Sequence, residues 1–148
     1  MDNSTHDFTM DLSSGLSAFE AKHFSRAMQL LSPVAEEGDA EAQYRLGVMF
    51  QNGLGMARND LQAYRWMKAA AEQNHALAQH GLGFMYLDGK CIPASPALAA
   101  HWFTLAAEQG LAGAQMNLAN MYREGNGVAR DEEKAREWMK KAGFEDTY

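Results

Sequence analysis

The chain has 148 residues, of which 47% are hydrophobic and 22% are charged, as is usual for a soluble globular protein with a substantial core. A formal net charge of -6, without a basic patch to offset it, makes nucleic acid an unfavourable partner. The single cysteine, Cys91, excludes an intramolecular disulfide and a cysteine-based zinc site.

The N-terminal segment is polar and acidic over residues 1–7, without the basic start and apolar centre of a secretion signal. No apolar run approaches the roughly 18 residues that are needed to cross a bilayer. We therefore expect a cytoplasmic protein that is not inserted into a membrane. A signal peptide that has been trimmed from the chain is the alternative.

The first predicted elements are two helices within residues 11–38, after a segment 1–10 that we expect to be frayed. Apolar residues recur in both at the spacing of one helix face. The first stripe consists of Leu12, Leu16 and Phe19, and the second of Ala27, Leu30, Leu31, Val34 and Ala35. Only the short link Lys22-His23 separates them. This pattern predicts a degenerate hairpin that caps the domain.

From residue 39 onwards the sequence repeats with a step of 36 residues, which predicts units at 39–74, 75–110 and 111–146. Several columns of identical residues keep this step. They are Ala42, Ala78 and Ala114, each followed by glutamine; Leu46, Leu82 and Leu118; Gly53, Gly89 and Gly125; and Trp66, Trp102 and Trp138. So many coincidences at one step are not accidental.

Each unit contains two helical stripes, and residues 11–148 are therefore expected to form one domain. The first unit has Ala42, Leu46 and Phe50 on one stripe and Ala63 and Trp66 on the other. Each second helix is preceded by a good N-cap residue, at Asn59, Ser95 and Asp131. Because such a hairpin cannot bury its apolar face alone, neighbours must stack. The pattern thus predicts an all-α solenoid of helix pairs.

The segments Ala42–Gly47, Gly53–Gly55 and Ala63–Ala70, with their counterparts from Ala114 to Ala142, resemble the Sel1-like repeat. This repeat is related to the tetratricopeptide repeat. The hairpin within residues 11–38, with its short link Lys22-His23, resembles a tetratricopeptide hairpin more closely than a Sel1-like one. The resemblance covers residues 27–146 and implies a right-handed α-α superhelix of antiparallel helix pairs. It also implies a role as an adaptor, since family members commonly assemble protein complexes in bacterial signalling and envelope systems and in eukaryotic quality control.

The sequence contains no constellation typical of catalysis, cofactor binding or metal binding. Its five histidines form no HxxxH or HExxH pair, and its glycine pairs recur with the repeat as turn residues. Cys91 has no matching histidine and replaces a loop glycine. A cysteine-rich branch of the resembled family is linked to β-lactam binding or hydrolysis, and this chain departs from it. We expect no enzyme and no cofactor, with that activity as the weaker alternative.

Candidate contacts with a protein or peptide partner lie on the first helix of each pair, which lines the concave side in this class of solenoid. They are Tyr44, Val48, Gln51, His80, Phe84, Leu87, Met116, Asn120 and Arg123. Several of them are large and apolar, which favours a docking groove with Tyr44 and Phe84 as anchors. Burial of these side chains by superhelical curvature is the alternative.

The C-terminal repeat allows a third interpretation. It ends with Trp138, Met139, Ala142 and Phe144, and no capping helix follows in the sequence. Since a solenoid end needs a polar outer face, this end could pair with a second copy and form a homodimer. The leading hypothesis is a non-catalytic scaffold that binds a protein or peptide in the concave groove, and a dimeric structural spacer is the alternative.

Overall fold

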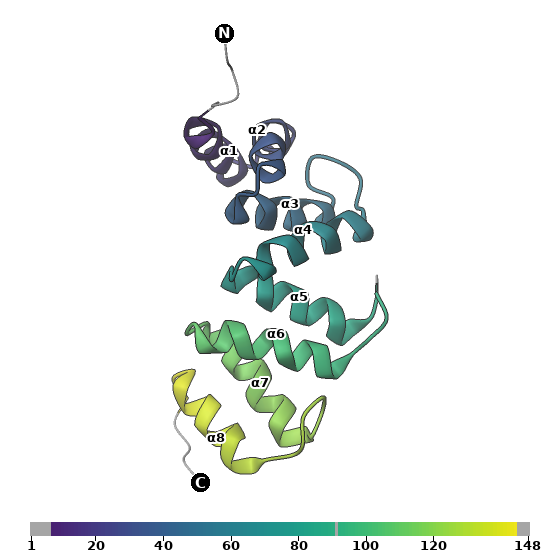
Figure 1. Cartoon of the computed structure of the whole chain (residues 1–148), viewed down its shortest axis with the longest axis vertical. Helices are drawn as coiled ribbons and strands as arrows, with labels where there is room; N and C mark the ends of the chain where they lie inside the picture. The colour runs from purple at the N-terminus through teal and green to yellow at the C-terminus, as the bar shows by residue number, and fades with distance from the viewer. Residues whose placement is uncertain (1–6, 91, 145–148) are drawn as a thin grey trace. The chain divides into compact units, whose positions relative to one another are not determined.

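The computed structural model describes residues 7–90 and 92–144, which form α-helices and no strand (Figure 1). The helices in this part of the chain are α1 Thr9–Glu20, α2 Phe24–Glu36, α3 Ala40–Asn52, α4 Asp60–Glu72, α5 Ala76–Asp88, α6 Pro96–Glu108, α7 Ala112–Glu124 and α8 Glu132–Lys141. They form two compact units, Met1–Ala70 and Ala71–Tyr148, which are described separately. The expected all-α class is confirmed.

The start of α1 differs from the expectation that residues 1–10 are frayed. Residues 1–6 lie outside the described part, and α1 already begins at Thr9. The Thr9 N–H donates to Asp7 Oδ1 at 2.9 Å, and Phe8 packs against the core of the unit. An acceptor and an apolar anchor therefore start the helix ahead of its first buried stripe. The division of the rest into one cap and three repeats stays a prediction.

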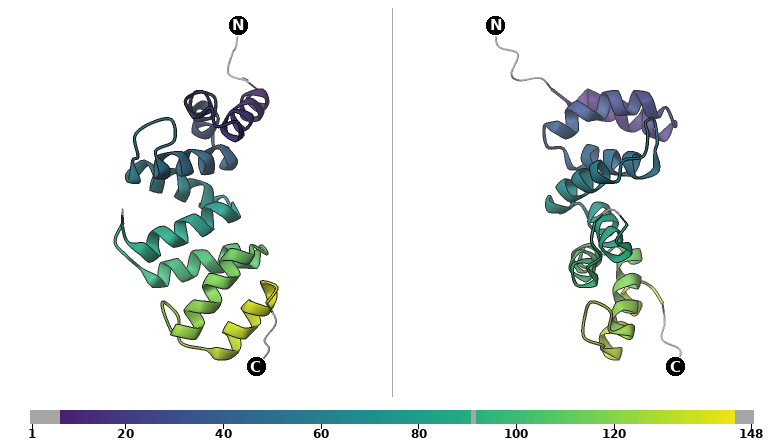
Figure 2. Two further views of the ribbon diagram at one scale, coloured as in Figure 1. Left: turned by 180° about the vertical axis from the view of Figure 1, so that it is seen from behind. Right: turned by 90° about the vertical axis from the view of Figure 1, so that its right-hand side faces the viewer.

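In the first unit, α1 and α2 lie side by side in every view (Figures 1 and 2). The predicted stripe of α2 is the centre of the core, with Ala27 and Leu31 fully buried. Gly15 allows the close approach of α1, because a Cβ at this position would lie 2.6 Å from Leu31 Cδ2. Lys22 takes a left-handed conformation in the predicted short link, with φ of 64°.

The tryptophan column is only partly a core column. Trp66 is buried, with 6% of its surface exposed, whereas Trp102 and Trp138 are half-buried. The ring of His101 lies against Trp102, and the Lys141 ammonium lies 4.4 Å from the ring centroid of Trp138. Trp138 still packs against the core of the second unit, and the Arg65 guanidinium lies over the ring of Trp66, so the three indoles differ in how far they are buried rather than in whether a polar side chain covers them.

The loop inside each repeat closes in the same way. The first helix ends at a glycine in the left-handed conformation, with φ of 67°, 66° and 69° at Gly53, Gly89 and Gly125. The predicted N-caps of the second helices are confirmed, since side-chain oxygens of Asn59, Ser95 and Asp131 accept from backbone N–H groups three residues on. The backbone N–H of each cap also donates to the carbonyl of an aromatic residue nine positions earlier: Phe50, Tyr86 and Tyr122.

A buried glutamine joins each repeat to the helix before it. Gln43 Nε2 donates to the Ala35 carbonyl at 3.1 Å, and the bonds from Gln79 to Ala71 and from Gln115 to Ala107 repeat this contact. In each case the carbonyl lies eight residues before the glutamine and belongs to the last turn of the preceding helix, where carbonyl groups lack helical partners. The Ala-Gln column of the sequence is therefore the hydrogen-bonded joint between helix pairs.

Candidate functional site

In the second unit, α5 and α7 contact each other at His80 and Asn117. Asn117 Nδ2 of α7 lies 3.0 Å from His80 Nε2 of α5. On α5, His80, Phe84 and Leu87 follow one another at helical spacing, as Met116, Asn120 and Arg123 do on α7. These six residues and Asn117 are together called here the α5–α7 face.

An aromatic cluster leads from the core of the second unit to this surface. The ring centroids of Phe84 and Phe103 are 5.3 Å apart, with planes at 81°. His80 contacts both rings, with centroid distances of 4.9 Å to Phe84 and 5.6 Å to Phe103. Phe103 is fully buried on α6, whereas 42% of Phe84 is exposed. Edge-on packing on an immobile ring holds Phe84 in place while it remains accessible.

Gly83 makes this arrangement sterically feasible. A Cβ at Gly83 would lie 2.7 Å from Phe103 Cε1, so only a residue without a side chain lets the Phe103 ring pack against α5 at this point. The ring then occupies the space beneath His80 and Phe84. A helix-interior glycine, which costs helix stability by itself, is thus part of the support of the face.

His80 is half-buried in this cluster, and burial lowers the pKa of its imidazole below the usual 6.5. Asn117 Nδ2 carries only N–H groups, so His80 Nε2 is the acceptor in this contact. The neutral ring then carries its proton on Nδ1. The electrostatics of the site therefore favour a neutral imidazole that accepts one hydrogen bond.

The remaining predicted residues of the α5–α7 face differ in exposure. Asn120 and Arg123 are exposed, and neither side chain makes a hydrogen bond or ion pair with any residue that the structure describes between 7 and 144. Leu87 and Met116 are half-buried. The face thus combines an accessible aromatic ring with polar groups on α7 whose hydrogen-bonding capacity is available to another molecule.

In the first unit, Tyr44, Val48 and Gln51 are half-buried on α3. Burial raises the pKa of Tyr44, an effect that the Arg45 charge opposes and the Glu41 charge reinforces. The structure does not bury Tyr44 or Phe84 completely, so neither anchor is removed from a partner's reach. The two anchors belong to different units, and each is considered within its own.

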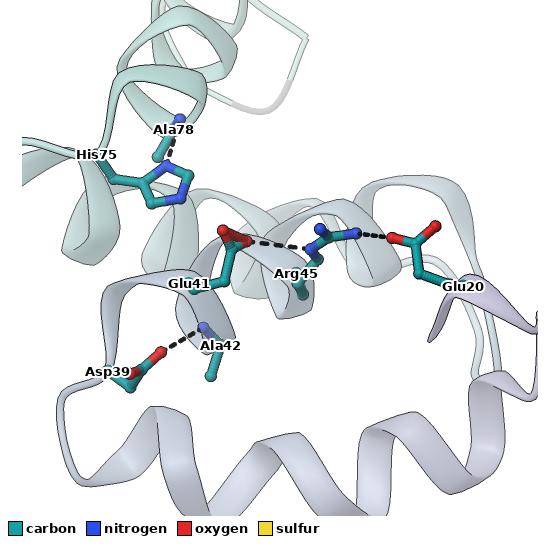
Figure 3. A network of polar contacts seen from close by, with 7 residues as sticks. All are labelled: Glu20, Asp39, Glu41, Ala42, Arg45, His75 and Ala78. Atoms are coloured by element: carbon teal, nitrogen blue, oxygen red, sulfur yellow. Dashed lines mark hydrogen bonds and ion pairs between the residues drawn. The ribbon is translucent and has the colours of Figure 1, made fainter. Parts of the chain in front are cut away.

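Arg45 organises the charges beside Tyr44 (Figure 3). Its Nη1 lies 2.9 Å from Glu20 Oε1 of α1, and its Nε lies 3.1 Å from Glu41 Oε2 of α3. The guanidinium also lies 4.7 Å from the ring centroid of Phe19. The same view shows the Asp39 carboxylate, which accepts from the Ala42 N–H at 2.8 Å and caps α3. Arg45 therefore ties α1 to α3 in the first unit.

Arg45 and Asn117 are site residues that the reasoning from sequence missed. They occupy the same position of the repeat, one residue after Tyr44 and Met116, and each contacts the first helix of the helix pair before its own. A polar residue beside a predicted contact stripe was the available signal. The predicted contacts comprise only one of the two rows that flank the buried stripe.

Other parts of the surface carry less chemistry. A cavity of about 420 Å³ in the first unit is lined by Phe8, Thr9, Leu12, Val34, Glu37, Gly38 and Asp39. Within residues 7–90 and 92–144, no group of three histidine, cysteine, aspartate or glutamate side chains is placed to hold a metal ion. No helix in that part of the chain is long and apolar enough to span a membrane. Cys91 lies outside the described residues.

Comparison with solved structures identifies the class of protein as an all-α helical-repeat solenoid. A protective antigen of uropathogenic Escherichia coli strains, which displays an SLR fold, is 37% identical with a TM-score of 0.88, over 93% of this chain and 30% of the antigen. A Sel1 repeat protein from Oxalobacter formigenes is 32% identical with a TM-score of 0.86, over 90% of this chain and 53% of that protein. This chain thus spans about a third and about half of their lengths.

The family follows from the sequence match. The family model described as Sel1 repeat matches residues 40–75, 76–111 and 112–143, which is more than half of the chain, so the chain belongs to the Sel1 repeat family. Helicobacter pylori cysteine rich protein B shares the fold, at 18% identity and a TM-score of 0.60, over 88% of this chain and 86% of that one. No curated protein matches. Sel1 repeat proteins are commonly protein-interaction scaffolds and are generally not catalytic.

Proposed function

We propose that this chain is a scaffold that binds a protein or peptide partner on the exposed faces of its first helices, with the α5–α7 face as a principal contact. One observation carries the proposal: Phe84 is 42% exposed although it packs on the fully buried Phe103. A large aromatic ring that is accessible, rigidly held and bordered by unpaired polar groups has the properties of a binding hot spot. Asn120 and Arg123 supply those polar groups.

The Tyr44 region of the first unit is a second contact in this proposal. Tyr44 is half-buried, so its ring is already held by the unit and loses little freedom when a partner covers it. The Glu20–Arg45–Glu41 network beside it keeps Arg45 in one position. A partner would therefore meet an ordered surface on α3, and Gln51 and Val48 would extend it along the helix.

The experiment uses site-specific photo-crosslinking in the native host. A photoreactive phenylalanine analogue replaces Phe84, Tyr44 or, as the matched control, Leu98, which is 45% exposed on α6 and lies outside the face. The expected result is one crosslinked protein from positions 84 and 44 and none from 98. The purified partner should then bind the Phe84→Ala variant about 30-fold more weakly than wild type, the loss of about 2 kcal/mol typical of a hot spot.

Unchanged affinity in a folded Phe84→Ala/Tyr44→Ala variant would contradict the proposal, and crosslinking from position 98 alone would move the contact to another face. The alternative of a dimeric spacer through the C-terminal repeat makes a different prediction. In that case light scattering should show a dimer at micromolar concentration, and a Trp138→Ala variant should be monomeric. Half-buried Trp138 is the residue whose loss should weaken such a contact most.

A further inference from the structure

The hydrogen bond between α5 and α7 depends on the protonation state of His80. Asn117 Nδ2, which can only donate, lies 3.0 Å from His80 Nε2. A protonated imidazole carries N–H groups on both ring nitrogens and cannot accept. Protonation therefore sets two donors against each other at this distance, and the contact cannot persist in its present form.

Among the described residues, no charged group contributes to the lowered pKa of His80. Burial is the single cause of the lowered pKa of His80. The helices around it carry His75 and Asp88 at the ends of α5, His101 and Glu108 on α6, and Arg123 and Glu124 on α7. None of these is bonded to the His80 ring, which instead contacts Phe84, Phe103 and Asn117. Asn117 is thus the polar group that must respond to a charge on His80.

Asn117 has a simple way to respond. The two ends of a side-chain amide have almost the same shape, so a half-turn about its last bond exchanges Oδ1 for Nδ2 without repacking. After this rotation Oδ1 accepts from the newly protonated Nε2. The opposite end of the amide changes from a carbonyl oxygen to an NH₂ group. Asn117 is partly exposed, so this change occurs at the surface of the face.

We infer that protonation of His80 reverses the side-chain amide of Asn117 and thereby replaces a hydrogen-bond acceptor by a donor on the α5–α7 face. With His80 neutral, the outer end of Asn117 accepts from N–H groups. With His80 charged, it donates to carbonyl or carboxylate groups and stands beside a positive charge. The consequence for partner binding rests on the proposed function, whereas the reversal itself is a property of the free chain.

The test is nuclear magnetic resonance of the uniformly ¹⁵N-labelled chain without a partner, followed from pH 8 to pH 5. Long-range ¹H–¹⁵N correlations identify which ring nitrogen carries the proton. We expect the neutral His80 ring to be protonated on Nδ1 and not on Nε2. The Asn117 NH₂ signals should shift with the midpoint of His80, and their nuclear Overhauser contact with His80 Hε1 should be lost at low pH.

Asn120 is the matched control, since it lies one turn further along α7 and its side chain makes no hydrogen bond or ion pair with another described residue. Its NH₂ signals should not follow the His80 midpoint. In an Asn117→Ala variant, checked for helix content by circular dichroism, the Nδ1–H preference of the neutral ring should disappear. A neutral ring protonated on Nε2, or an Asn117 contact that persists through the titration, overturns the inference. Because no partner is present, either result leaves the proposed function untouched.

Discussion

A single glutamine side chain completes the hydrogen bonding around Gln79 in the second unit. Gln109 Nε2 donates to Gln79 Oε1 at 2.9 Å and also reaches the backbone oxygen and Oδ1 of Asn74. Gln79 is 1% exposed, so its oxygen has no access to solvent. The corresponding oxygen of the third repeat, Gln115 Oε1, is buried without a partner among the described residues. The same column is therefore fully hydrogen-bonded in one repeat and incomplete in the next.

The first prediction concerns this bond. Gln109→Glu replaces the donor by a carboxylate that faces three acceptors, so we expect the free energy of unfolding to fall by about 1–3 kcal/mol at pH 7. Acid should restore part of the loss, because a protonated carboxyl group can donate to Gln79 Oε1. Urea unfolding at pH 7 and pH 4 measures both effects. Gln29→Glu, at an exposed position of α2, is the control and should change stability by less than about 0.5 kcal/mol.

The second prediction follows from the lowered pKa of His80. The unfolded chain binds this proton more tightly than the folded chain does, so the stability that the neutral ring contributes is complete above about pH 6.5. It should be lost progressively as the pH falls below that value towards the folded-state pKa. Urea unfolding from pH 7.5 to pH 5 should show a steeper loss in wild type than in His80→Gln. An identical slope in both would contradict burial as the cause.

At the scale of the element, the packing of α5 on α6 depends on a matched pair of positions. Gly83 faces the ring of Phe103 in the second repeat, and Gly47 faces Met67 in the first. The third repeat has an alanine, Ala119, at the position of these glycines. The second helix carries methionine, a flexible side chain that fills irregular space, in both the first and the third repeat, so methionine occurs with a glycine in one of them and with an alanine in the other.

The third prediction tests that pairing. Gly83→Ala gains up to about 1 kcal/mol of helix propensity but places a Cβ 2.7 Å from the buried Phe103 ring, which costs about 1–3 kcal/mol of overpacking. We therefore expect net destabilisation in thermal or urea unfolding. Adding Phe103→Met should reduce the cost of Gly83→Ala in a double-mutant cycle.

Gly113→Ala is the matched control for that substitution. A Cβ there would lie 3.4 Å from His80 Cε1, which is an ordinary contact, so this variant should be neutral or stabilised by up to about 1 kcal/mol. If both alanine variants were equally stable, close packing would not explain why Gly83 is a glycine.

The helices themselves were predictable because the same helix boundaries recur in all three repeats. One column of the repeat supplies the N-cap of every second helix, at Asn59, Ser95 and Asp131. The joint between pairs was visible as the Ala-Gln column, but its bond was not, because a glutamine at a core position does not reveal which carbonyl it meets. The reach of Gln43 back to Ala35 depends on how consecutive helices cross.

At the scale of the whole molecule, the fold class and the family followed from the sequence, whereas the contents of the candidate face followed only in part. The stripe from His80 to Leu87 was predicted, but its partner on α7, Asn117, was not. The spacing of residues within one helix predicts which row of side chains faces a neighbour with an uncertainty of about one residue. The angle between two helices then selects which of two adjacent rows makes contact, and a single sequence does not contain that angle.

The fourth prediction also belongs to the whole chain. With a net charge of -6, we expect no saturable binding to a fluorescein-labelled DNA duplex at about 0.15 M ionic strength. Fluorescence anisotropy measures this, with a basic DNA-binding domain as the positive control. Saturable binding that weakens steeply with added salt would show that a local cluster of cations overrides the overall charge.

The joint made by the buried glutamines has a consequence for how such chains change in length. Gln43, Gln79 and Gln115 each bond to an alanine carbonyl eight residues earlier, and the alanines themselves recur with the same 36-residue step. A segment of one period therefore carries a glutamine donor near its start and an alanine carbonyl acceptor near its end. Inserting or excising such a cassette leaves every remaining glutamine with an equivalent carbonyl. The array can therefore be lengthened by duplication of one period, or shortened by its deletion, without a new kind of interface between helices.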